Sequence, residues 1–138
     1  LQVVSTTSST AQSTTSYSYV DVTGLTVSIT PSSTSNKILV MYNDNAYLSK
    51  GTGIATGYAQ WQILRDTTAL SVKEFIQRDG VGGQDHYNTF PMSITYLDSP
   101  SSTSSLTYKV QMKNGDSTTV ASQFRDELGT IIVMEIAG

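Results

Sequence analysis

Apolar and polar residues alternate along most of this chain, which is the pattern of β-strands that bury one face and expose the other. In residues 105–113 the apolar side chains fall on even positions and the polar ones on odd positions. The same alternation predicts strands over residues 25–30, 58–65 and 90–97. Residues 70–80 suit a short helix or a strand equally, and no long segment has helical spacing. The pattern predicts one all-β domain over residues 1–138, an antiparallel β-sandwich.

Local breaks in the alternation predict how the strands are joined. The apolar phase slips by one residue at Thr23-Gly24, which indicates a β-bulge or a sharp bend. Asn114-Gly115 is a strong hairpin signal and predicts a return strand over residues 118–125. Residues 31–35 and 100–104 both read Pro-Ser-Ser-Thr-Ser, and we interpret them as loops that join neighbouring strands or cross between two sheets.

Two predicted strands, residues 37–42 and 130–136, are apolar on both faces. In a two-layer sandwich one face of each strand meets the core, so the other face needs a second cover. Another subunit would provide that cover, and the predicted contact residues are Leu39, Met41, Ile131 and Val133. The alternative is that the Ser/Thr-rich segment 1–19 folds back over these strands.

Composition narrows the class of protein. The net charge is −3, which argues against a nucleic-acid partner because such proteins need a basic surface. There is no cysteine, and no apolar run approaches the roughly 18 residues of a membrane span. Only 14% of residues are charged, so the hydroxyl groups of Ser and Thr supply much of the polar surface. A surface of this kind is common in extracellular β-proteins and fibres. The chain begins with Leu1, so we expect a processed product or part of a longer fibre chain.

No group of residues predicts catalysis, a metal or a cofactor. His86 is the only histidine, no Gly-x-Ser-x-Gly elbow is present, and the neighbouring Asp85 would point to the opposite face of a strand. Asp79 and Asp85 flank a glycine-rich turn without the spacing of a calcium loop. A polysaccharide depolymerase would need two facing carboxylates, which no predicted strand provides. The protein is therefore expected not to be an enzyme.

The loops offer candidate binding residues. Residues 48–57 and 78–88 combine several glycines with polar and aromatic side chains that can stack on sugars and form hydrogen bonds. The candidate receptor-binding residues are Tyr47, Lys50, Tyr58, Gln84, Asp85, His86 and Tyr87. Trp61 and Tyr96 have inward parity and are predicted to lie in the core. The alternative is that these loops are solvated turns with no partner.

Three stretches, "VDVTGLTVSITPSSTSNKILV", "LDSPSSTSSLTYKVQ" and the terminal "VMEIAG", are similar to C-terminal modules of tail-fibre or fibre-like proteins from bacteriophages of aquatic bacteria. The resemblance runs over nearly the whole chain. It implies a jelly-roll tip that forms a homotrimer on the virion, contacts other virion proteins and attaches to a bacterial surface glycan or protein. The alternative is a capsid decoration or fibre-anchoring protein without a receptor.

Overall fold

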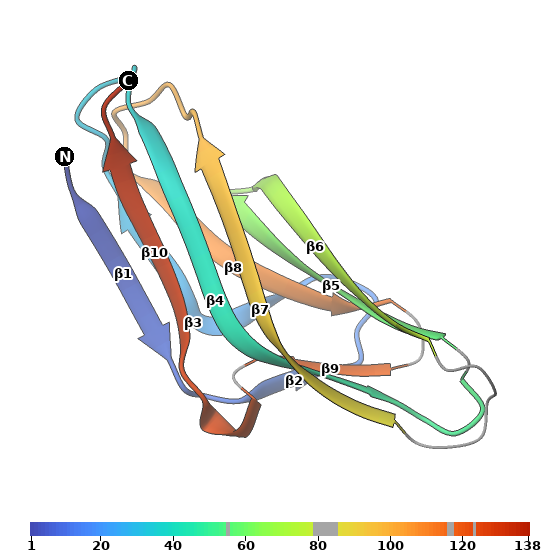
Figure 1. Cartoon of the computed structure of the whole chain (residues 1–138). Coiled ribbons are helices and arrows are strands. Elements are labelled where there is room, and N and C mark those ends of the chain that lie inside the picture. Colours follow the sequence, from blue (N-terminus) through green and yellow to red (C-terminus); the bar gives the residue numbers. More distant parts are fainter. Residues whose placement is uncertain (55, 79–85, 116–117, 123) are drawn as a thin grey trace.

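In the computed structural model the chain forms two antiparallel β-sheets that face each other (Figure 1); residues 1–138 are described except 55, 79–85, 116–117 and 123. The strands are β1 (Val3–Ser8), β2 (Gln12–Thr14), β3 (Val20–Ile29), β4 (Lys37–Lys50), β5 (Thr56–Arg65), β6 (Thr68–Arg78), β7 (His86–Asp98), β8 (Leu106–Asn114), β9 (Thr118–Ser122) and β10 (Gly129–Ile136). One turn of 3-10 helix, Phe124–Asp126, precedes β10. The described part of the chain has no helix with the length and apolar character needed to cross a bilayer.

The strand order is that of a jelly roll. The front sheet has the order β1-β10-β4-β7, and the back sheet has the order β3-β8-β5-β6. The chain moves repeatedly between the two sheets, as in a double-sheet jelly roll. The short strands β9 and β2 extend the front sheet beyond β10 and β1, because β4 pairs with β10 over residues 37–43 and with β9 over residues 47–50. The predicted antiparallel, jelly-roll-like sandwich is confirmed.

The core lies between the two sheets and is built from alternate side chains of each strand. The predicted inward faces of residues 25–30, 58–65 and 105–113 are confirmed, since all of the following are less than 10% exposed: Leu25, Val27, Ile29, Ala59, Trp61, Ile63, Leu106, Tyr108, Val110 and Met112. The Trp61 indole nitrogen donates to the Ser122 hydroxyl at 2.9 Å. Tyr96 is only partly buried.

The hairpin predicted at Asn114-Gly115 is wrong. Strand β8 already has β3 on one side and β5 on the other, so no edge of β8 is available to β9. The chain instead crosses to the front sheet, where β9 pairs with β4 and β2. Gly115 marks the crossing: its amide donates to the Tyr58 carbonyl at 2.9 Å, and the Tyr58 ring occupies the space where a Cβ at residue 115 would lie.

The N-terminal segment does not cover the outer face of the front sheet. Strand β1 pairs with β10 at the edge of that sheet, from Val3 opposite Met134 to Ser8 opposite Gly129. Strand β2 pairs with β9 in the same way. The alternative in which segment 1–19 folds over the double-faced strands is therefore wrong. Residues 70–80, undecided from sequence, contribute to strand β6 as far as Arg78.

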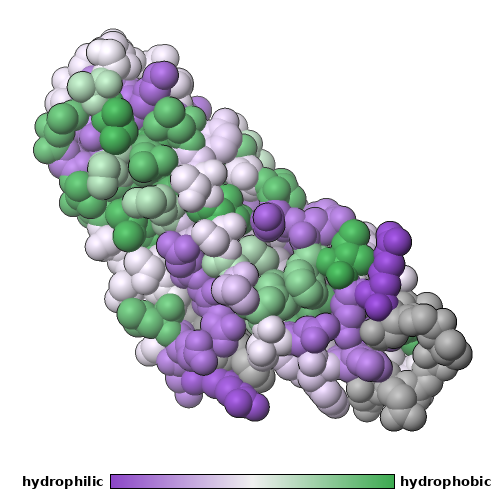
Figure 2. Space-filling model, in the orientation of Figure 1, coloured by the Kyte–Doolittle hydropathy of each residue, from purple (hydrophilic) through white to green (hydrophobic). Residues whose placement is uncertain are grey.

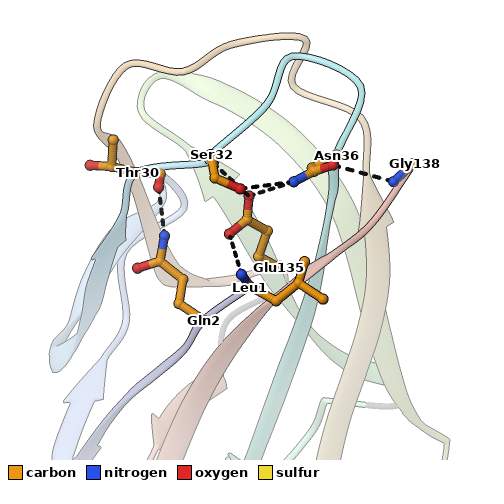
Figure 3. Close-up of polar contacts among 7 residues, drawn as sticks. All are labelled: Leu1, Gln2, Thr30, Ser32, Asn36, Glu135 and Gly138. Carbon is orange, nitrogen blue, oxygen red and sulfur yellow. Dashed lines mark hydrogen bonds and ion pairs between the residues drawn. The ribbon is translucent and has the colours of Figure 1, made fainter.

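Both Pro-Ser-Ser-Thr-Ser stretches cross between the sheets, and both do so at the end of the sandwich that holds the chain termini (Figure 1). The first is fixed by Glu135, whose Oε1 accepts from the Ser32 amide at 2.5 Å, the Ser32 hydroxyl at 2.7 Å and the Asn36 side-chain amide at 2.7 Å (Figure 3). Its Oε2 lies 3.9 Å from the Leu1 amino group. These donors stabilise the carboxylate and lower the pKa of Glu135 to about 2. The Asn36 side chain makes the largest contribution, and Ser32 makes the next largest.

A second buried carboxylate joins the two sheets at the start of the other crossing. Asp98, the last residue of β7, is 5% exposed. Its carboxylate accepts two bonds from one Arg65 guanidinium nitrogen, at 2.8 and 2.7 Å, and one from the Tyr108 hydroxyl at 2.7 Å. Arg65 and Tyr108 belong to the back sheet. Burial, followed by the bond to Asp98, raises the pKa of Tyr108 above its usual value.

The predicted bulge at Thr23-Gly24 is confirmed and gives a test of the fold. The pairing of β3 with β8 shifts register between Asp21 and Thr26, and Gly24 has φ +82°. A Cβ at residue 24 would lie 2.8 Å from Ser8 atoms. We expect Gly24→Ala to lower the free energy of unfolding by about 2 kcal/mol, measured by urea denaturation. Gly51→Ala is the control, since its Cβ would meet no atom within 4 Å; equal losses in both variants would contradict the argument.

Candidate functional site

Tyr47 and Tyr87 lie side by side on the outer face of the front sheet, toward the end opposite the termini. In the pairing of β4 with β7, Tyr47 is opposite Thr89 and Ser49 is opposite Tyr87, so the two tyrosines are diagonal neighbours on one face. Their ring centroids are 6.2 Å apart, and the ring planes differ by 20°. Tyr87 is 64% exposed. Two residues predicted separately for binding therefore form one stacked pair, which we call the tyrosine pair.

The outward-facing positions of β4 and β7 beside the tyrosine pair carry no charged side chain. The outward-facing positions of β4 and β7 next to it hold Asn45, Ser49, Thr89 and Pro91. Exposed aromatic rings offer an apolar face for stacking, and the phenol hydroxyls both donate and accept hydrogen bonds. A neutral ligand with one apolar face and several hydroxyl groups, such as a sugar ring, matches this chemistry.

Lys50 is not available to an external ligand, so its predicted receptor-binding role is wrong. It faces inward at the end of β4 and is 1% exposed. Its ammonium group donates to the carbonyl of Ile54. Burying a lysine is costly unless its charge is well solvated by hydrogen bonds. The side chain therefore holds the turn that follows β4, next to the tyrosine pair.

The other predicted binding residues are more scattered. His86 is exposed and lies opposite Lys50 in the pairing of β7 with β4, on the face away from Tyr47 and Tyr87. Tyr58 is partly buried against Gly115 on the back sheet. Gln84 and Asp85 lie outside the described residues. Among the described members of the predicted set, Tyr47 and Tyr87 are neighbours on the outer face, and Lys50 and His86 are opposite each other with inward parity.

The residues predicted for a subunit contact divide between the two sides of the front sheet. Leu39 and Met41 point outward and are partly exposed. Ile131 and Val133 are 0% exposed in the core, so their assignment to an outer face is wrong. Glu135 lies on the same inward side of β10 as these two residues, where its carboxylate binds the 30–36 loop. Because a charged residue usually faces solvent, its presence on this side hides from sequence analysis that this is the buried side of β10. The outward side of β10 carries Ile132, Met134 and Ile136.

Several polar side chains are buried in the fold, and their burial was not predicted from the sequence. Asp44, 8% exposed, accepts from the Tyr42 hydroxyl at 2.7 Å and from the Asn45 amide at 2.8 Å. Burial, followed by the nearby Asp44 charge, raises the pKa of Tyr42 well above its usual value. The Tyr42–Asp44 spacing of two residues on one strand was the available signal, because such residues share a face. We assign this pair a structural role, since Tyr42 is fully buried.

Comparison with known proteins gives weak structural similarity. No family model and no curated protein matches the sequence. The VP2 subviral particle of infectious bursal disease virus matches with 16% identity and a TM-score of 0.41, over 99% of this chain and 33% of that chain. T=1 particles derived from the same virus match with 10% identity and a TM-score of 0.38, over 99% and 36%. The Cry4Aa toxin of Bacillus thuringiensis matches with 10% identity and a TM-score of 0.29, over 82% and 18%. The chain spans about a third of the length of the viral chains that it matches.

Proposed function

We propose that this chain is the attachment knob of a bacteriophage fibre, carried on the virion as a homotrimer, and that the tyrosine pair binds a glycan of the bacterial surface. The stack of the partly buried Tyr47 and the exposed Tyr87 is the observation that carries the proposal. The sequence resemblance to phage fibre modules supports it. The fold is compatible with it, since jelly rolls include both viral and carbohydrate-binding domains.

The position of the tyrosine pair suits attachment. The N- and C-termini lie together at one end of the sandwich, and β4 runs from that end toward the opposite one, with the antiparallel β7 beside it (Figure 1). A knob joined to a fibre through its terminal end would direct the tyrosine pair away from the fibre. Because a single exposed aromatic pair binds weakly, several knobs on one particle would supply the strength by multivalency.

Replacing Tyr87 with Ala tests the proposal. We expect the fluorescently labelled domain to bind cells of a susceptible aquatic bacterium, and Tyr87→Ala to weaken that binding about tenfold because the stacking surface is lost. Tyr17→Ala is a matched control, since Tyr17 is 61% exposed and lies outside the pair. Periodate oxidation of the cells, which cleaves sugar diols, should abolish binding if the receptor is a glycan.

The alternative function is capsid decoration or fibre anchoring. It is favoured by the apolar side chains that the front sheet exposes near the termini, such as Val3 and Leu97, which could contact another virion protein. In that case the unmodified domain would bind no cells and would bind intact particles instead. Equal cell binding by the unmodified domain and Tyr87→Ala would remove the tyrosine pair from the proposal while leaving attachment in place.

A further inference from the structure

The outer face of the front sheet changes character along its length. Near the termini, four apolar side chains form a row across four strands, since Val3 pairs with Met134, Met134 with Leu39, and Leu39 with Leu97. The next row adds Ile132 opposite Met41. We call these six residues the apolar face. Figure 2 shows hydrophobic surface gathered over this end of the sheet, whereas the other end is mixed.

Part of the apolar face is open to solvent in the single chain. Val3 is 60% exposed and Leu97 is 48% exposed, at the two margins of the row. A shallow groove of about 330 Å³ runs beside Met134, lined also by Leu1 and Ile136. Contiguous exposed apolar surface on a small protein usually marks a contact with another molecule.

The chain has no described segment that covers this face. The N-terminal strand β1 lies in the plane of the sheet and contributes Val3 to the apolar face. The C-terminal strand β10 lies between β1 and β4 and contributes Met134 and Ile132. The two loops that cross between sheets at this end leave Leu97 half exposed.

The charge pattern favours a second copy as the occupant. Among the described outward-facing positions of β1, β10, β4 and β7, Lys37 is the only charged residue. The whole chain carries a net charge of −3, which opposes the approach of another copy, whereas this face adds little charge repulsion. An anionic membrane or nucleic acid would call for a basic margin around the face, which one lysine does not provide.

From these observations we propose that the apolar face is the surface through which copies of this chain associate. The inference rests on the assembly of copies named in the proposed function, and it assigns the contact to outward-facing Leu39, Leu97 and Met134 rather than to the buried Ile131 and Val133. The tyrosine pair, at the other end of the same sheet face, stays accessible in such an assembly.

Leu97→Asp tests the inference with little risk to folding, because Leu97 is already half exposed. Ser93→Asp is the matched control: it lies on the same strand and the same outward face, two rows further from the termini. Light scattering of the purified chain over a range of concentrations should show an oligomer for the unmodified chain and for Ser93→Asp. We expect Leu97→Asp to weaken association about 100-fold or more, since burying a carboxylate in an apolar contact is costly. Circular dichroism would confirm that both variants remain folded.

Two results would overturn the inference. One is an unmodified chain that stays monomeric at the highest concentration, and the other is an oligomer that Leu97→Asp leaves unchanged. Cell binding, measured on the same samples, separates this outcome from the proposed function. A monomer that still binds cells would refute the subunit contact and the homotrimer but leave the attachment role in place, and an oligomer that binds none would refute the attachment role alone.

Discussion

Replacing Asp98 with Asn should lower the free energy of unfolding by about 3 kcal/mol. The substitution keeps the shape of the side chain but removes the charge that Arg65 faces at 2.7 Å. It also places an amide group among donors, so that either Arg65 or the Tyr108 hydroxyl loses an acceptor. Because both partners belong to the back sheet and Asp98 to the front sheet, the loss weakens the contact between the sheets. Urea denaturation at neutral pH measures it.

Asp21→Asn is the control for this comparison. Asp21 also pairs with a cation, since its carboxylate lies 2.9 Å from the Lys109 ammonium group, but the Asp21 side chain is 56% exposed. Exposed ion pairs contribute less than about 1 kcal/mol, so this variant should lose little stability. If Asp98→Asn lost no more stability than Asp21→Asn, the buried carboxylate would have no special role in joining the sheets.

Acidification should destabilise the protein through Glu135. The pKa of this carboxyl group is about 2 in the folded chain and 4.5 without the fold. A lowered folded-state pKa means that the carboxylate stabilises the fold fully above pH 4.5, and that this contribution is lost as the pH falls from 4.5 through about 2. Thermal unfolding followed from pH 7 to pH 2 should therefore show a steep fall in the melting temperature in that interval.

The variant Glu135→Gln isolates this group from the other acids. Its amide cannot carry the charge that the Asn36 and Ser32 donors stabilise. We expect it to melt at a lower temperature than the unmodified chain at pH 7, and the two melting temperatures to converge as the pH approaches 2. Parallel curves with a constant gap would show that Glu135 does not titrate in this interval.

Side-chain periodicity was enough to predict most of the longer strands and most of the core, because a period of two assigns each residue to a face, but it did not predict β1 or β2 and left β6 undecided. It could not decide the face of a strand that is apolar on both sides, such as β10. It also could not show that β8 is occupied on both edges, which is why Asn114-Gly115 joins two sheets instead of closing a hairpin. Strand partners depend on the whole topology, which local sequence does not specify.

The candidate site was predictable in the same partial way. Tyr47 and Tyr87 were both singled out, but they lie 40 residues apart in sequence, and only the register of β4 with β7 makes them neighbours. Lys50 illustrates the opposite error, because a lysine near a loop is usually exposed and this one faces the interior. The carboxylates of Glu135 and Asp98 were missed because their partners come from distant segments.

The position of β10 has a kinetic consequence. The last strand of the chain lies inside the front sheet, between the first strand and β4. Until β10 has been synthesised, β1 lacks its strand partner and β4 lacks its partner over residues 37–43, so the front sheet cannot be completed. The chain should therefore fold late and slowly, as expected for a topology dominated by contacts between distant residues. Premature termination before residue 129 would leave an aggregation-prone chain rather than a smaller folded domain.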